Sequence, residues 1–143
     1  MEGKTKPPNL MTETELIALM DINGIGTDAT IADHIEKILA RQYIIKESRG
    51  TGKNKVIELI PTELGMGLVE GFRDIGLDNI SLTKPFLRKN LEEKLVSICE
   101  GRTNKDTVCY EMITLYREAF ALSNQNQRKI VDTYRKIVTA NTN

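Results

Sequence analysis

The sequence predicts a mainly α-helical fold with one small β-hairpin, and three observations carry this prediction. Apolar residues recur three and four positions apart in most stretches, which is the pattern of helices that bury one face. Only the stretch 42–60 differs, because it holds two β-rich runs around a basic, glycine-containing tip. The length of 143 residues fits one domain or a piece of one.

Composition excludes several classes of protein. Apolar residues at 40% and charged residues at 28% exclude wholesale disorder. No apolar run approaches the ~18 residues of a membrane span, and the first ten residues hold no apolar signal core. We therefore expect a soluble intracellular protein without a membrane partner. Lys plus Arg total 20 and Asp plus Glu total 20, so the net charge gives no support for binding to a polyanion. Aromatic residues make up only 5% of the chain, so few rings are available for stacking on nucleic-acid bases.

The chain opens with a polar linker over 1–11, because its Pro-Pro pair cannot enter a helix interior. Thr12 and Glu15 then have the spacing of a capping box, which predicts a helix start. The buried stripe of this helix is formed by Leu16, Leu19 and Met20. Gly24 and Gly26 end the helix in a tight turn, since glycine adopts positive φ at no steric cost.

A second helix is expected after Gly26, with Thr27 as its N-cap. Its core stripe consists of Ile31, Ile35, Ile38 and Leu39. Its outer side consists of Thr30, Asp33, Lys37 and Arg41. The basic residues of the hairpin that follows are Arg49, Lys53 and Lys55. This order of elements over 12–60 is typical of a winged-helix-like helix-turn-helix whose hairpin is the wing.

Residues 61–121 predict a helical bundle within the same domain. A short helix opens at Thr62 and is broken by glycines at Gly65, Gly67 and Gly71. A loop follows, in which Asp74 and Asp78 have no evident partners. The next helix has Thr83 as its N-cap and Pro85 in its first turn.

Asn104 caps the following helix, and the apolar face of that helix is wide enough for burial between two neighbours. That face consists of Val108, Cys109, Met112, Ile113, Leu115, Tyr116, Ala119 and Phe120. The polar residues 123–126 interrupt the helix. Residues 122–143 hold a terminal amphipathic helix, whose polar side carries Arg128, Lys129, Arg135 and Lys136.

The sequence offers no self-contained catalytic or metal site. His34 is the only histidine, and its helix neighbours include no nucleophile or acid, so we expect it to flank the core. No Walker-type phosphate loop and no acidic pair for magnesium is present. Cys99 and Cys109 are expected to pack as small hydrophobic residues rather than to form a disulfide or bind zinc.

The turn GIGTDAT is the strongest signal for a binding site in the sequence. A glycine turn followed by threonine at a helix start presents free amides and hydroxyls, which suit a backbone phosphate. A plain helix–helix turn explains the same pattern, and Asp28 would repel a phosphate at close range. The basic wing tip and the basic side of the last helix are weaker signals, because charged surfaces are usually only solvated.

Three segments in unbroken order from Pro7 to Phe120 closely resemble type IA DNA topoisomerases, and among them eukaryotic topoisomerase III of the alpha kind. They are PPNLMTETELIALMDINGIGTDATIADHIEKILARQYI, LIPTELGMGLVEGF and LTKPFLRKNLEEKLVSICEGRTNKD. Residues 121–143 fall outside the resemblance. The resemblance implies a fragment of the base domain of that enzyme, which lacks the metal-binding Toprim acids and the SYPRT-like tyrosine motif.

The resemblance implies that this piece holds single-stranded DNA while the parent enzyme cleaves, passes and rejoins strands. The implied contacts are Gly26, Thr27, Ala29 and Thr30; helical phase adds Lys37 and Arg41, and the wing adds Arg49, Lys53 and Lys55. None of the chain's tyrosines matches the nucleophile, so the chain alone is predicted to be inactive. Magnesium would belong to the parent enzyme, and no cofactor is expected in this fragment.

The partners implied are the rest of the topoisomerase chain, a RecQ-family helicase and an OB-fold accessory protein, in the nucleus. Two alternatives remain open at this point. An independent winged-helix module would read duplex DNA with Thr30, Asp33, Lys37 and Arg41 in the major groove. A protein-interaction segment would contact no nucleic acid, and zero net charge favours it over the winged-helix module.

Overall fold

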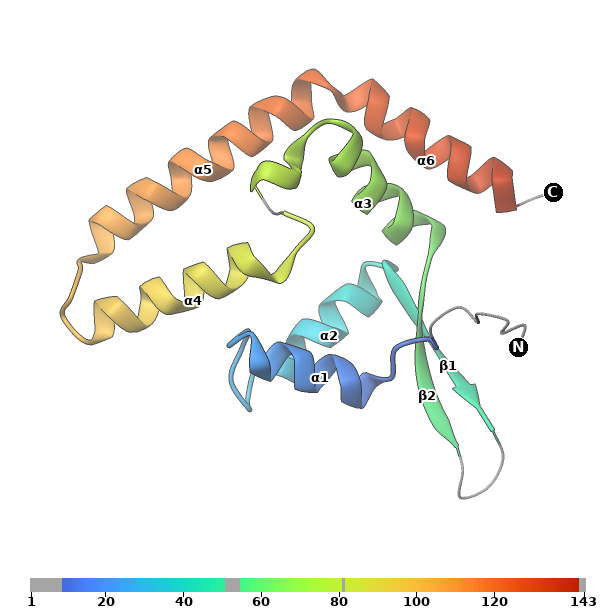
Figure 1. Cartoon of the computed structure of the whole chain (residues 1–143), viewed down its shortest axis with the longest axis horizontal. Coiled ribbons are helices and arrows are strands. Elements are labelled where there is room, and N and C mark those ends of the chain that lie inside the picture. The colour runs from blue at the N-terminus through green and yellow to red at the C-terminus, as the bar shows by residue number, and fades with distance from the viewer. Residues whose placement is uncertain (1–8, 51–54, 81, 142–143) are drawn as a thin grey trace, which may run out of the picture.

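The computed structural model describes residues 9–50, 55–80 and 82–141, with the side chains of 78 and 79 left out. Its elements are α1 (Glu13–Ile22), α2 (Ile31–Ala40), β1 (Ile44–Arg49), β2 (Val56–Pro61), α3 (Glu63–Asp74), the 3-10 helix η2 (Leu77–Ile80), α4 (Pro85–Cys99), α5 (Lys105–Gln125) and α6 (Gln127–Asn141) (Figure 1). The prediction of a mainly helical chain with one small hairpin is confirmed. Most of the predicted linker 1–11 and the wing residue Lys53 lie outside the described residues.

The start of α1 is a capping box, as its sequence predicts. The Thr12 hydroxyl accepts from the Glu15 amide at 3.2 Å, and the Thr12 amide donates to the Glu15 carboxylate at 2.7 Å. This donation lowers the pKa of Glu15 below its ordinary value. Gly24 and Gly26 then take φ values of 61° and 83°, which confirms the glycine turn.

The second helix begins three residues later than predicted. Its N-cap is Thr30 rather than Thr27, and the Thr30 side chain makes no capping hydrogen bond into the helix. Instead the Thr30 hydroxyl accepts from the Thr27 amide at 2.8 Å, and the Thr27 carbonyl accepts from the amides of Thr30 and Ile31. A threonine side chain that bonds to nearby backbone favours a turn over a helix, which explains the shift. Ile31 and Ile35 are buried as expected.

The hairpin is a two-stranded antiparallel sheet whose register runs from Ile44 opposite Pro61 to Arg49 opposite Val56. The segment before α1 continues this sheet, because the Leu59 amide donates to the Met11 carbonyl at 2.8 Å. Whether α1, α2 and this hairpin form a winged helix stays a prediction. α1 contains no buried residue, so its apolar side chains are not packed into a closed helix-turn-helix core.

The three glycines of α3 do not break that helix, contrary to the prediction. They allow close packing instead. A Cβ added at Gly67 would lie 2.7 Å from the Tyr134 ring, and one added at Gly71 would lie 2.9 Å from Ile130. α6 therefore lies directly on the glycine face of α3 (Figure 1). Helix packing against a neighbour outweighs the cost of about 1 kcal/mol that a glycine imposes on a helix interior.

The main core lies where the end of α3, η2, α5 and α6 meet. Its buried members are Ile75, Leu77 and Ala119, and the partly buried side chains around them are Phe72, Ile80, Leu82, Leu122 and Ile130. Asp74, predicted to have no partner, accepts a 2.6 Å hydrogen bond from the Thr133 hydroxyl, and its carbonyl accepts from Lys129. The loop pattern misled the prediction because these donors lie more than 50 residues further along the chain.

Helices α4 and α5 form a long arm on one side of the molecule (Figure 1). Pro85 is the first residue of α4 as predicted, but the N-cap position is Lys84 rather than Thr83. Asn104 caps α5 by accepting from the Thr107 amide at 2.9 Å, and Asn126 ends α5 where the break was expected. None of the described helices is long and apolar enough to cross a membrane.

The apolar face of α5 is not buried between two neighbours, which corrects the prediction. Tyr110 is 74% exposed, Phe120 is 73% exposed and Ile113 is 55% exposed, while only Val108 and Ala119 are buried. Cys99 and Cys109 are also exposed rather than packed. The described residues supply neighbours along the inner side of the helix only, so the outer half of a wide face faces solvent.

Candidate nucleic-acid interface

The candidate interface is built on the turn between α1 and α2. Gly26 has φ at 83°, and a Cβ at this position would lie 3.1 Å from the Thr30 hydroxyl oxygen and 3.2 Å from the His34 ring. Both the backbone conformation and the close packing therefore require glycine here. The turn is held against the first turn of α2, and this contact fixes the direction of the amides that follow.

The backbone donors of this turn face solvent. Thr27, Asp28 and Ala29 are exposed, and Thr30 is half-buried. Within the described ranges, we find no protein acceptor for the amides of residues 28, 29, 32 and 33. Amides at the start of a helix carry the positive end of its dipole, so an anion can bind them without a basic side chain.

Two hydroxyl side chains and two carboxylate side chains, which have opposite effects on phosphate binding, complete the helix start. The hydroxyls of Thr27 and Thr30 lie 3.3 Å apart and share a hydrogen bond. Asp28 and Asp33 place two carboxylates beside the free amides. These carboxylates repel phosphate, and Coulomb repulsion near a surface amounts to several kcal/mol at contact distances. The site is therefore suited to weak binding by neutral donors.

Lys37 and Arg41 extend the site along α2. They follow Thr30 by seven and eleven residues, which places all three on one side of the helix over about 16 Å. Both basic side chains are exposed, and neither has an ion-pair partner among the residues that the structure describes. A strand that lies along this side of α2 can contact the amides at one end and the two cations further on.

The wing does not join this site. The ends of β1 and β2 at Arg49 and Val56 lie at the opposite end of the α1–α2–hairpin half from the glycine turn (Figure 1). Arg49 forms a 3.6 Å ion pair with Glu58, while its side chain is 77% exposed, and Lys55 is exposed as well. The predicted contacts therefore fall into two groups, and only the group on the turn and α2 forms a continuous surface.

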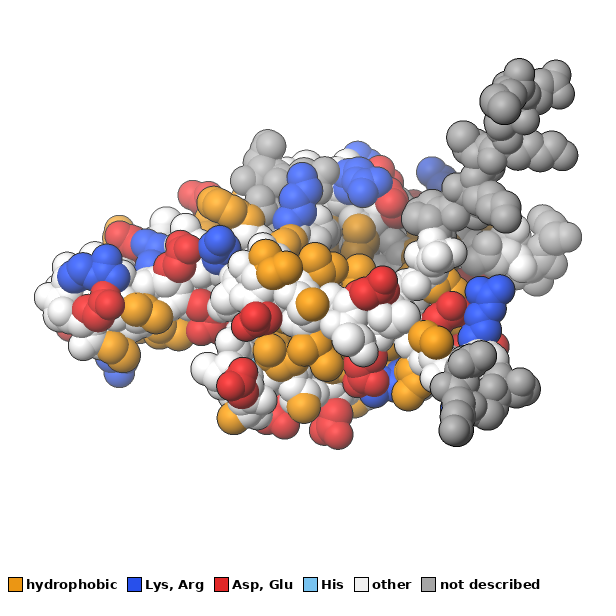
Figure 2. Space-filling view, turned by 60° about the horizontal axis from the view of Figure 1, so that its bottom comes forward, with side chains coloured by type: hydrophobic (Ala, Val, Ile, Leu, Met, Phe, Trp, Pro, Cys, Tyr) orange, Lys and Arg blue, Asp and Glu red, His pale blue; other side chains and the backbone are white. Residues whose placement is uncertain are grey.

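The charge around the turn is a feature that the overall composition hid. The segment 12–41 holds two basic residues, Lys37 and Arg41, and six acidic residues: Glu13, Glu15, Asp21, Asp28, Asp33 and Glu36. Its formal charge is therefore −4. Figure 2 brings the lower part of Figure 1 forward and shows acidic and apolar side chains in the middle of this face, with basic ones toward its edges. A charge count by segment would have found this from the sequence.

The described residues do not assemble catalytic machinery at the turn. His34 is half-buried under Gly26, which fits its expected place beside the core. No group of three or more His, Cys, Asp or Glu side chains in the described ranges could hold a metal ion. What the turn offers is hydrogen-bond donors and a hydroxyl pair, which are groups that bind rather than react.

Comparison with known proteins identifies the family. A family model described as DNA topoisomerase matches residues 1–110, which is more than three quarters of the chain. The chain belongs to the type IA DNA topoisomerase family. It is 54% identical over 133 residues to DNA topoisomerase 3 of Candidozyma auris and 48% identical over 126 residues to DNA topoisomerase 3 of Schizosaccharomyces pombe.

The match to DNA topoisomerase 3-alpha of Homo sapiens is 42% over 130 residues and covers 91% of the chain. These alignments cover 93% and 87% of the chain for the two fungal proteins, but only 20% of each of them and 12% of the human protein. The chain thus spans a fifth or less of its topoisomerase relatives. An alignment over 93% of the chain also reaches well past Phe120, so the similarity extends further than the motifs indicated.

Proposed function

We propose that this chain is the part of a type IA DNA topoisomerase that holds a single DNA strand. The whole enzyme would then change DNA topology by cleaving one strand, passing another and religating the first. The observation that carries the proposal is the exposed start of α2, where four backbone amides in the described ranges lack a protein acceptor. In this proposal, those amides bind one phosphate, and Lys37 and Arg41 contact the next phosphates along α2.

The charge of −4 on residues 12–41 supports a single strand over a duplex. Double-stranded DNA carries one negative charge per ~1.7 Å of axis, whereas one strand carries one per ~3.4 Å. A duplex would therefore meet about twice the repulsion from the six acidic residues. A helix that reads the major groove normally combines base contacts with many basic phosphate contacts, and α2 carries Asp33 and Glu36 on its exposed residues. These observations disfavour the duplex-reading alternative.

The rest of the topoisomerase chain is the partner that we propose for the exposed apolar surfaces. The accessible surface is 10987 Å², against about 7,400 Å² expected for a compact protein of 16.1 kDa. The accessible surface would still exceed the value for a compact protein by about 1,800 Å² if the area of a fully extended chain were subtracted for the residues outside the described ranges. Exposed aromatic side chains such as Tyr110 and Phe120 are typical of surfaces that another protein segment covers.

Four further proposals rest on the family resemblance. We place the magnesium ion and the active-site tyrosine in the remainder of the parent enzyme. A RecQ-family helicase and an OB-fold protein are the proposed partners of that enzyme, and the nucleus is its proposed location. Recombination and repair are the processes in which such an enzyme would act.

Fluorescence anisotropy over a salt series tests the proposed function. The chain is titrated against a labelled single strand and against a duplex of the same length, at low and at moderate salt. We expect weak binding that prefers the single strand, with a shallow salt slope because few phosphates are neutralised. A duplex preference with sequence discrimination would support the winged-helix module, and no binding at low salt would support the protein-interaction segment. Relaxation of supercoiled DNA by this chain alone would contradict the assignment of the chemistry to the parent enzyme.

A further inference from the structure

Helix α6 is one of two strongly basic segments of this neutral chain, the other being the hairpin segment 46–55 with a formal charge of +3. That helix carries four basic residues, Arg128, Lys129, Arg135 and Lys136, and one acidic residue, Asp132, so its formal charge is +3. The segment 12–41, which contains the candidate strand site, has a formal charge of −4. Long-range attraction for a polyanion is therefore stronger at α6 than at the turn before α2.

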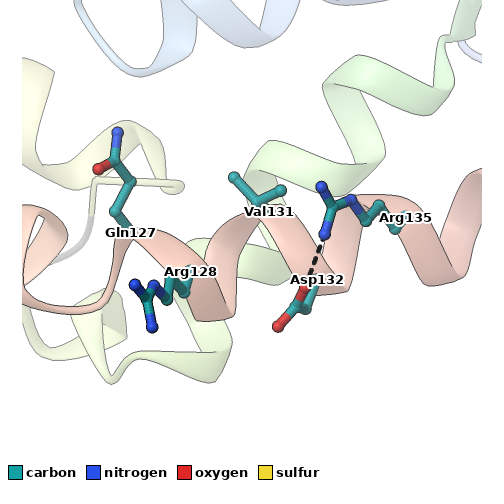
Figure 3. Close-up of a pocket in the computed structure, with 5 residues that line it drawn as sticks. All are labelled: Gln127, Arg128, Val131, Asp132 and Arg135. Carbon is teal, nitrogen blue, oxygen red and sulfur yellow. Dashed lines mark hydrogen bonds and ion pairs between the residues drawn. The ribbon is translucent and has the colours of Figure 1, made fainter.

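The outer side of α6 forms a shallow hollow between two arginines. Figure 3 shows Arg128 and Arg135 on either side of Val131, with Gln127 and Asp132 beside them. The arginines lie seven residues apart, which is two helical turns and about 10 Å. Arg128 has no ion-pair partner within the described ranges. Arg135 pairs with Asp132 at 3.3 Å, but both side chains are more than 60% exposed, so this pair is weak and can exchange for a ligand.

The opposite side of α6 holds the helix in place. Tyr134 and Ile130 lie on Gly67 and Gly71 of α3. Thr133 and Lys129 bind the carboxylate and the carbonyl of Asp74. Because the inner side is fixed, the arginines on the outer side start from defined positions, and a ligand has little backbone to order. Lys129 is engaged with Asp74, so Arg128, Arg135 and Lys136 are the cations that remain available.

We propose that the outer side of α6 binds the phosphate backbone of a nucleic-acid strand, as a second surface apart from the turn before α2. The inference rests on the proposed function, because it assumes that the chain handles DNA. The guanidinium group donates two parallel hydrogen bonds to phosphate oxygens, which suits the two arginines. An acidic protein is a poorer fit, since a protein interface needs apolar pockets for anchoring side chains and this hollow offers only Val131.

The two surfaces contact different stretches of DNA. α6 lies along the upper edge of the view in Figure 1, whereas the turn between α1 and α2 lies in its lower half. A short oligonucleotide would therefore occupy one of them at a time, whereas a long strand or a second strand would engage both. The geometry predicts that affinity rises with strand length until both surfaces are covered, by the effective concentration that linkage gives the second contact.

The test compares three variants of the full chain on a labelled single strand of about 40 nucleotides over a salt series. We expect the double variant Arg128→Gln/Arg135→Gln to bind roughly five- to tenfold more weakly, with a salt slope smaller by about 1.4, since each phosphate contact contributes about 0.7 for a single strand. Arg117→Gln is the matched control, because it removes an exposed arginine of α5 and should change neither quantity. Asp132→Asn should tighten binding, because it removes the carboxylate that competes for Arg135.

These outcomes separate the inference from the proposed function. The inference would be overturned if the double variant had the same affinity and salt slope as Arg117→Gln. It would also be overturned if Asp132→Asn did not bind the single strand more tightly than the unmodified chain. If the inference fails in this way, loss of single-strand binding in a Thr30→Ala/Lys37→Ala variant would still support the proposed strand site at the turn before α2. The inference would also be overturned, in favour of an acidic protein partner, if a polyglutamate peptide displaced the labelled strand as effectively as an unlabelled oligonucleotide of equal charge. A gain in Asp132→Asn cannot arise from misfolding, so the test remains decisive if the double variant is unstable.

Discussion

The Thr133 hydroxyl donates a 2.6 Å hydrogen bond to the Asp74 carboxylate, and this contact joins the middle of α6 to the end of α3. Thr133 is the buried polar residue of the core region, with 8% of its surface exposed. A buried hydroxyl is stable only with a partner, so the contact specifies one register of α6 on α3. Around this contact, the ring of Tyr134 packs against Gly67 and the side chain of Ile130 packs against Gly71.

The first prediction concerns the glycine face of α3. Gly67→Ala should lower the free energy of unfolding by about 1–3 kcal/mol, because the new Cβ would overlap the Tyr134 ring and backbone. Helix propensity alone would give the opposite sign, since alanine favours helices by about 1 kcal/mol over glycine. Urea denaturation followed by circular dichroism measures the change. Val69→Ala is the control on the exposed side of α3, and a stabilised Gly67→Ala variant would contradict the packing described here.

The second prediction concerns the contact between Thr133 and Asp74. Thr133→Val should cost about 1–2 kcal/mol of stability, because the isosteric side chain leaves the Asp74 carboxylate without its donor. Asp74→Ala should cost a similar amount, and the double variant should cost less than the sum of the two. A double-mutant cycle from chemical denaturation checks this coupling. Thr114→Val, on the exposed side of α5, serves as the control, and strict additivity would show that the contact does not couple the helices.

The third prediction concerns the pH dependence of the α1 capping box. The pKa of Glu15 is lowered by the Thr12 amide and then by its hydroxyl, so the cap stabilises the fold above the ordinary glutamate pKa of 4.5 and is lost as the pH falls through the lower folded value. Titration by NMR should therefore find the pKa of Glu15 below the ordinary glutamate value of 4.5. Thr12→Pro, which removes both the amide donor and the hydroxyl, should return Glu15 to that value. Equal pKa values for Glu15 before and after this substitution would show that the capping box is absent in solution.

The fourth prediction concerns the strand site. Thr30→Ala and Lys37→Ala should each weaken single-strand binding several-fold, because the first loosens the turn that orients the amides and the second removes a phosphate contact. Only Lys37→Ala should also reduce the salt slope. Thr14→Ala and Lys105→Ala are matched controls at exposed positions of α1 and α5. Anisotropy with unchanged affinity in both site variants would reject the start of α2 as a binding site.

The fifth prediction concerns the outer face of α5. Replacing Tyr110 and Phe120 by serine should reduce concentration-dependent self-association without lowering stability, because these side chains are more than 70% exposed. Analytical ultracentrifugation measures the association, and thermal unfolding checks the stability. A marked loss of stability would show that the face is packed within this chain.

Local signals in the sequence predicted the helix boundaries that depend on neighbouring residues. Thr12, Thr62 and Asn104 cap their helices through contacts three residues away, and Asn126, the last residue of the polar run 123–126, ends α5. The turn of Gly24 and Gly26 was predictable for the same reason. Such features follow from the chemistry of a few adjacent residues.

Features that depend on distant residues were not predictable in the same way. Gly67 and Gly71 of α3 resemble helix breakers in the sequence because their partners in α6 lie more than 50 residues away. The start of α2 was placed too early because Thr27 and Thr30 satisfy each other rather than the helix. Periodicity located the apolar stripe of α5 correctly, but it cannot show whether a second neighbour is present to cover it. The glycine turn predicts the candidate strand site, whereas its acidic surroundings follow from the charge of the segment 12–41 and not from the net charge of the chain.

The seating of α6 on Gly67 and Gly71 bears on where this protein can be divided. The recognised family model stops at residue 110, within the second turn of α5, but the chain that covers the glycines of α3 begins only after Asn126. Shortening the protein to its most recognisable motifs would expose the glycine face of α3 to solvent and would remove Thr133, the donor to Asp74. Protease sensitivity should therefore spread from the carboxyl end inward to α3 once α6 is lost. Libraries of random deletions should tolerate cuts before Met11 far better than cuts after Phe120.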